Sequence, residues 1–167
     1  AHRFVCKRSA SAARLPSNAS HRKQDEPALR LLHPVARRLA EERGAADLVL
    51  GNNVLAQVPD VNDFVAGVAA LLAPAGTATF EFPHLAKLIE HLEYDTIYHE
   101  HFSYLSLLTT QRVLAASGLT VVDVEELPTH GGSLRTWSMP TESARPATLS
   151  VAAVLAAEAG AGLHTVE

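Results

Sequence analysis

Apolar residues recur at helical spacing in one segment of the chain and alternate with polar residues in the next. Positions 61, 64, 65, 68, 71 and 72 are all apolar, which predicts a helix over residues 61–72 with one buried face. Asp60 stands where the N-cap of that helix is expected, and the run Pro-Ala-Gly at 74–76 is expected to end it. Residues 77–82 then alternate polar and apolar side chains, which predicts a strand that ends at Pro83.

Similar patterns recur along the chain from Pro34 onward. We expect further helices over residues 35–43, 85–92 and 149–159, and one from Thr109 or Thr110 to Ser117. Further strands are expected over residues 47–50, 119–124 and 134–139. This alternation of helices and strands is typical of an α/β sheet. Only a nine-residue loop without a helical pattern joins the last two strands, so we expect them to form an antiparallel pair at the edge of a mostly parallel sheet.

Composition and charge divide the chain unevenly. Of its 167 residues, 47% are hydrophobic and 19% are charged, which is enough apolar material for a core. Seven of the fourteen basic residues lie within residues 1–30, whereas the rest of the chain is acidic. We therefore expect a basic, disordered leader over residues 1–33, a main domain over 34–140, and the start of a C-terminal domain over 141–167.

Several classes of function are disfavoured by the same composition. The acidic main body carries no basic stripe, so we expect no nucleic-acid partner. No apolar run is long enough to cross a membrane, and no signal-peptide pattern is present, so we expect no membrane partner. Cys6 is the only cysteine, which excludes an internal disulfide and favours a cytoplasmic protein.

The richest candidate chemistry lies in the run Tyr-His-Glu-His-Phe-Ser-Tyr at residues 98–104. An imidazole can both accept and give a proton near neutral pH, so His101 is a candidate general base. Glu100 can orient that ring or raise its basicity, and the phenol of Tyr98 can donate to a developing oxyanion. The pattern favours proton abstraction next to a carbonyl, while Phe102 and Tyr104 are expected to pack in the core.

Two other interpretations of this run remain open. His99 and His101 are two residues apart and could share a metal ion with other histidines, namely His84, His91 and His130. Carboxylates at familiar metal-binding offsets are missing, so we assign no metal ligands. Alternatively, the run forms a hydrogen-bonded loop that has no catalytic role.

The expected strand ends supply a second group of candidates. Ligands of open α/β sheets lie beyond the carboxyl ends of the strands. Gly51, Asn52 and Asn53 are expected to end the strand over 47–50, and His84 follows the next strand. We expect a cleft there, lined by amides and imidazoles. Gly131-Gly132 is interpreted as a turn, and Arg135 just beyond it is a candidate for an anionic ligand.

Three segments resemble a known family. Residues 47–60 (DLVLGNNVLAQVPD) resemble the fourth-strand region of class I S-adenosylmethionine-dependent methyltransferases. Residues 93–106 (EYDTIYHEHFSYLS) and 125–135 (EELPTHGGSLR) look like the sugar C-methyltransferases that act on nucleotide-linked 4-keto deoxysugars. The resemblance covers roughly residues 34–160. It implies the second half of a Rossmann-like sheet followed by the start of a C-terminal domain.

This resemblance implies a cofactor, a reaction and residue roles. The cofactor would be S-adenosylmethionine, and the partner would be a nucleotide-sugar substrate. The methyl group of the cofactor would be transferred to the sugar carbon next to its ketone. His101 matches the family's catalytic base, with Glu100 and Tyr98 as neighbouring active-site residues. Gly51 and Asn52 would pass close to the cofactor. The expected substrate contacts are Asn53, Gln57, His84, His130 and Arg135.

The chain also departs from the family pattern. Gln57 stands where family members usually have a histidine, and glutamine cannot shuttle a proton. The glycine-rich loop that meets the cofactor and the cysteine-rich zinc segment are both missing from this sequence, and the C-terminal domain is short. We therefore interpret the chain as a fragment or degenerate copy of a sugar C-methyltransferase. The alternatives are a non-catalytic binding module and, less favoured, a metal-binding protein.

Overall fold

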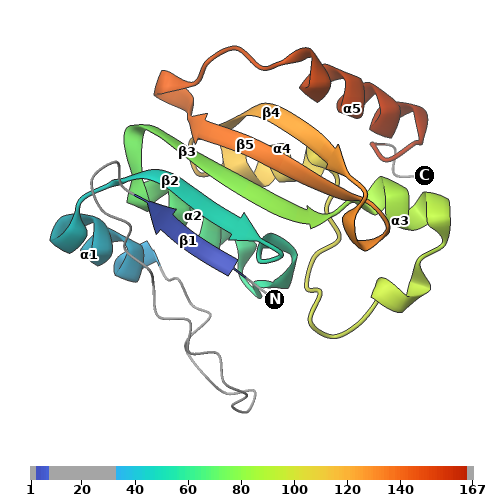
Figure 1. Ribbon diagram of the computed structural model, residues 1–167, viewed down its shortest axis with the longest axis horizontal. Coiled ribbons are helices and arrows are strands. Elements are labelled where there is room, and N and C mark those ends of the chain that lie inside the picture. The colour runs from blue at the N-terminus through green and yellow to red at the C-terminus, as the bar shows by residue number, and fades with distance from the viewer. Residues whose placement is uncertain (1–2, 8–32, 165–167) are drawn as a thin grey trace.

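The computed structural model describes residues 3–7 and 33–164, which form one sheet with helices (Figure 1). The strands are β1 (Arg3–Lys7), β2 (Ala46–Asn52), β3 (Leu72–Pro83), β4 (Leu119–Leu127) and β5 (Ser133–Pro140). The helices are α1 (His33–Arg43), α2 (Val61–Leu71), α3 (Leu85–His91), α4 (Leu107–Ala115) and α5 (Leu149–Gly160). Short 3-10 turns are η2 (Leu55–Gln57), η3 (Tyr94–Thr96), η4 (Thr129–Gly131) and η5 (Thr141–Ser143).

The strand order across the sheet is β1-β2-β3-β5-β4. The α/β class and the antiparallel β4–β5 pair at one edge are confirmed. The expectation of a mostly parallel sheet is wrong for the described strands, because only β2 and β3 run parallel. β5 returns from β4 through a short turn and inserts beside β3, so that its direction opposes both neighbours.

β1 lies within the segment expected to be a disordered leader. Arg3–Lys7 pair antiparallel with β2, from Arg3 opposite Asn52 to Lys7 opposite Leu48. The leader prediction is therefore wrong for these residues, and the rest of that leader lies outside the described residues. β1 gives the outer edge of β2 a hydrogen-bonding partner, so this edge of β2 is not open.

The core lies on one face of the sheet. Figure 1 shows α2 and α4 behind the strands and α5 along the β4 edge. Phe80 and Phe82 of β3 are fully buried on the helix-covered face, together with Leu134 of β5. Phe64 of α2 meets Phe80 edge-to-face at a centroid distance of 6.3 Å. The amphipathic pattern of residues 61–72 thus places α2 as predicted, and Asp60 caps it by accepting from the Asp63 amide.

Two predicted boundaries are corrected by the structure. Ser106, not Thr109 or Thr110, is the N-cap of α4, and it forms a capping box with Thr109. The helix was expected to run to residue 72 and to end at the Pro-Ala-Gly segment, but β3 already begins at Leu72 and runs through that segment. No helix of the described segments is both long and apolar enough to span a bilayer.

Candidate active site

His101 lies in a short loop between η3 and α4, with hydrogen-bonding partners for both ring nitrogens. Its Nδ1 lies 2.9 Å from the carbonyl oxygen of Thr96, and its Nε2 lies 3.1 Å from the hydroxyl of Tyr98. A carbonyl can only accept, so Nδ1 must carry the proton and donate it. In the neutral ring Nε2 then bears the lone pair, and the Tyr98 hydroxyl donates to it. The loop therefore presents Nε2 as the basic nitrogen of His101.

The loop is anchored on both sides of this imidazole. Before it, the backbone amide and the hydroxyl of Thr96 both donate to the Glu93 carbonyl, at 3.2 and 2.8 Å, which fixes the carbonyl that orients the ring. After it, the amides of Phe102 and Ser103 donate to the Ala56 carbonyl, at 2.9 and 3.1 Å. Ala56 belongs to η2, directly beyond β2. The candidate base is thus tied to the carboxyl end of β2.

Aromatic rings surround the imidazole. The Tyr98 ring lies 4.3 Å from it, centroid to centroid, and the half-buried Tyr104 ring meets it edge-on at 6.0 Å. Phe102 is 57% exposed, so the expectation that it packs in the core is wrong. The backbone amide of Phe102 donates to the Ala56 carbonyl, and its side chain is exposed to solvent.

Asn53 and Gln57 flank this anchor point. Asn53 adopts a left-handed backbone conformation with φ of 52°, which asparagine tolerates better than most residues, and its amide donates to the Glu81 carbonyl. Gln57 ends η2 and is half-buried. The Ala56 carbonyl lies between them in sequence, so the predicted amide residues and the His101 loop are brought to one region.

The strand was expected to stop before Gly51, but β2 continues through Gly51 and ends at Asn52. A Cβ at Gly51 would lie 2.9 Å from the Phe80 ring, so close strand-to-ring packing already requires a glycine there. Asn52 pairs with Glu81 on the neighbouring strand. The contact of either residue with a cofactor stays a prediction.

Glu100 and His99 are exposed at the tip of the loop. Within the described part of the chain, neither side chain has a hydrogen-bonding or ionic partner. In the same part, no group of three or more His, Cys, Asp or Glu side chains is arranged to hold a metal ion. The geometry therefore gives the metal-binding alternative no support.

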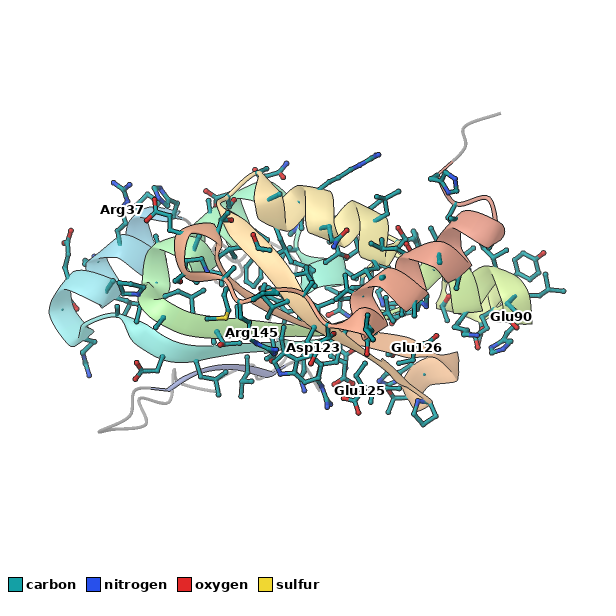
Figure 2. The ribbon with its side chains drawn as sticks, turned by 90° about the horizontal axis from the view of Figure 1, so that it is seen from above. Arg37, Glu90, Asp123, Glu125, Glu126 and Arg145 are labelled. Carbon is teal, nitrogen blue, oxygen red and sulfur yellow. The ribbon has the colours of Figure 1, made fainter. Side chains whose placement is uncertain are left out.

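Arg135 lies between two carboxylates on the sheet. Its guanidinium donates to Glu81 at 2.8 Å on one side and to Glu125 at 3.3 Å on the other. The three residues are register neighbours across β3, β5 and β4. Figure 2 shows Glu125 and Asp123 on the side of the sheet that faces away from α4. These two carboxylates neutralise the Arg135 guanidinium and use part of its donor set, so its binding of an anionic ligand stays a prediction.

His84 follows β3 as expected but is turned into the protein. It is 3% exposed, and its Nε2 donates to the Glu158 carboxylate at 2.9 Å. That carboxylate also accepts from the backbone amides of Leu107 and Leu108. Burial raises the pKa of Glu158, but the hydrogen bonds from His84 and these amides outweigh it and leave the pKa below its ordinary value. A substrate contact by His84 would require its bond to Glu158 to break.

His130 lies in the turn η4, where it is exposed with φ of 51°. This turn contacts α3, since His91 Nδ1 lies 3.0 Å from the Gly131 carbonyl oxygen and can donate to it.

Among the described residues, no hydrogen bond or ion pair joins His130, His84 or Arg135 to His101. The structure thus brings Tyr98, His101 and the η2 region together and holds the other predicted substrate contacts elsewhere.

Sequence reasoning missed Thr96, Ala56 and Glu158. Thr96 and Ala56 act through their backbone carbonyls, and every residue type has a backbone carbonyl, so the sequence does not single them out. Glu158 did carry a signal, because it is the only charged residue in α5. A lone carboxylate in an apolar helix indicates a buried partner.

Comparison with known proteins supports the assignment of a family. A family model described as a methyltransferase domain matches residues 8–124, which is more than half of the chain. C-methyltransferase NovU of Streptomyces niveus is 39% identical over 129 residues, which cover 77% of this chain and 31% of NovU. This chain thus spans less than a third of the length of that relative.

Solved structures show weaker likeness. Magnesium protoporphyrin IX methyltransferase from Synechocystis PCC 6803, with bound SAH, gives a TM-score of 0.44 at 13% identity, covering 60% of this chain and 47% of that one. A 16S rRNA (adenine(1408)-N(1))-methyltransferase from Catenulisporales acidiphilia gives 0.39 at 20% identity, covering 57% and 50%. Because the family model matches residues 8–124, the chain belongs to the methyltransferase domain family.

Proposed function

We propose that this chain is part of an S-adenosylmethionine-dependent C-methyltransferase that methylates a carbon next to the ketone of a nucleotide-linked keto sugar. The observation that carries the proposal is the hydrogen bonding of His101. Thr96 holds the proton on Nδ1, which leaves Nε2 as a base directed at the Tyr98 hydroxyl. Family membership and the identity to a C-methyltransferase support methyl transfer to carbon.

The proposed reaction begins with removal of the proton from the carbon next to the ketone. The C–H electron pair moves into an enolate, and the proton passes to His101 Nε2. Tyr98 gives up its bond to Nε2 as substrate enters and donates instead to the enolate oxygen. Gln57, on the η2 turn, donates its amide hydrogen to the same ketone oxygen. Bound S-adenosylmethionine would supply the methyl group that the enolate carbon accepts, with the methyl–sulfur bond breaking as the new carbon–carbon bond forms and S-adenosylhomocysteine as the second product.

The cofactor fits the donor set at the end of β2. S-adenosylmethionine supplies an electrophilic methyl group on a sulfonium. Asn52 would hold its polar groups, because its amide is half-buried and can both donate and accept. Asn53, the next residue, itself adopts a left-handed backbone conformation just beyond the strand, and its side chain is the proposed contact with the substrate. We place this reaction in the cytoplasm, which suits a chain with one cysteine.

Methyl transfer from labelled S-adenosylmethionine to a nucleotide-linked 4-keto deoxysugar tests the proposal. The chain should yield a methylated sugar, and His101→Ala should lower its rate about 100-fold or more, the usual contribution of a general base. His99→Ala is the matched control, because His99 is an exposed imidazole of the same loop without a partner among the described residues. Equal rates for parent and His101→Ala would refute the role of His101.

A further inference from the structure

Glu158 is a buried carboxylate on the last helix of the described chain. It is 2% exposed, and both of its oxygens are used. Oε1 accepts from His84 Nε2 at 2.9 Å and from the Leu107 amide at 2.5 Å, and Oε2 accepts from the Leu108 amide at 3.0 Å. The bonds join three elements: α5, the N-terminus of α4, and the residue that follows β3.

These bonds complete the N-terminus of α4. The first four amides of a helix have no acceptor within it. In α4, the Ser106 hydroxyl accepts from the Thr109 amide and the Thr109 hydroxyl accepts from the Ser106 amide. Leu107 and Leu108 are left, and Glu158 takes both. A carboxylate is also the group that the positive end of a helix favours. Glu158 thus caps α4 from another helix.

The same carboxylate holds the exit of the His101 loop. Leu105 forms a parallel bridge with His84, and its carbonyl accepts from the Leu85 amide at 3.0 Å. Glu158 binds His84 on one side of this bridge and Leu107 on the other. The loop from Tyr98 to Tyr104 lies immediately before Leu105 and is mostly exposed. Its position therefore depends on how firmly the bridge is held.

We propose that Glu158 is a positioning residue for the candidate base: by clamping His84 to the start of α4, it holds the exit of the loop that carries His101. The proposal rests on the proposed function only in naming His101 as the base. Glu158 is buried, so we assign it no contact with substrate or cofactor. It acts through Leu105, which ends the loop whose amides at Phe102 and Ser103 contact Ala56.

Hydrogen exchange of backbone amides, followed by NMR on the full chain, separates positioning from general stability. Glu158→Gln keeps the size but removes the charge and leaves one oxygen to accept. We expect the amides of Phe102 and Ser103 to exchange at least about tenfold faster, and to accelerate more than the amides of the β3–β5 ladder, which report only the change in global stability. Glu142→Gln, an exposed carboxylate of η5, is the control and should change neither.

Two results would overturn the proposal: unchanged exchange at Phe102 and Ser103, or an equal acceleration in the loop and the ladder, which marks general stability only. Glu158→Asp provides the same test if the glutamine variant does not fold, since its shorter side chain reaches fewer partners.

In turnover, Glu158→Gln should lower kcat and leave KM unchanged. If His101→Ala keeps full turnover, the proposed function fails, and the amide exchange still decides whether Glu158 holds the loop.

Discussion

The carbonyl oxygen of Thr96 accepts a hydrogen bond from His101 Nδ1 at 2.9 Å. This relationship fixes the tautomer of the candidate base, because the neutral ring can then accept only at Nε2. It also shows how a short loop prepares an imidazole without a buried carboxylate. Glu100, the neighbour that was expected to orient the ring, is exposed, and the backbone carbonyl of Thr96 orients the ring instead.

Tyr98→Phe removes the hydroxyl that faces Nε2 and leaves the ring stacked on His101. If this hydroxyl donates to the enolate oxygen, kcat should fall about 100-fold, the usual effect of removing one such donor. Steady-state kinetics with the keto sugar nucleotide measure the change. Tyr94→Phe is the control, since Tyr94 is an exposed phenol of the preceding turn. An equal loss in both variants would argue against a specific role for Tyr98.

Gln57→His places an imidazole on η2, where the resemblance to the sugar C-methyltransferases implies one. A histidine there could exchange a proton near the ketone, which glutamine cannot do. We expect kcat to rise about tenfold, and a second titrating group to enter the pH profile between about pH 5 and 8. Gln57→Asn should show neither effect. A histidine variant with an unchanged rate and pH profile would contradict this account of position 57.

Arg135→Ala leaves the Glu81 carboxylate without its guanidinium partner. Glu81 is buried, so the free energy of unfolding should fall by about 2–3 kcal/mol. This loss is smaller than that of a fully buried ion pair because Arg135 is partly exposed. Urea unfolding measures the loss. Arg145→Ala breaks a more exposed pair with Asp123, 3.9 Å apart (Figure 2), and should cost less than about 1 kcal/mol. Adding Glu81→Gln should recover much of the Arg135→Ala loss, and no recovery would mean that the pair is not the cause.

Acid should weaken the fold through Glu158. The pKa of its carboxyl is lower in the folded chain than in the unfolded chain, so the unfolded state binds the proton more readily. This stabilisation is present above the unfolded pKa, near 4.3, and disappears as the pH falls through the folded pKa. Urea unfolding between pH 7 and pH 3 should show the loss in the parent and a smaller loss in Glu158→Gln. Identical pH curves for the two proteins would exclude this contribution.

Local patterns in the sequence predicted most of the elements but not all of their pairings. The spacing of Phe64, Val65 and Val68 was enough to place α2, because burial against a sheet imposes that period. β1 was missed because Arg3–Lys7 is short and flanked by basic residues, and its stability comes from β2, some forty positions away. The direction of β5 likewise depends on the strand beside which it inserts, which no local pattern encodes.

The candidate site was predictable where its contacts are local. Tyr98 and His101 are three residues apart, and one turn of chain brings their side chains together. Arg135 binds Glu81 over a separation of 54 residues, and His84 binds Glu158 over 74. These carboxylates occupy two side chains that were expected to meet the substrate. Their partners become identifiable only when the strands and α5 are assembled.

Exchange of the sugar proton for deuterium tests the central claim most directly, because it isolates proton abstraction from methyl transfer. The parent chain and its His101→Ala and His99→Ala variants are incubated in D2O with a nucleotide-linked 4-keto deoxysugar and S-adenosylhomocysteine, and NMR follows the signal of the proton next to the ketone. The account predicts that the parent and His99→Ala exchange this proton and that His101→Ala does so about 100-fold more slowly or worse. Exchange by His101→Ala at the parent rate would show that another group is the base.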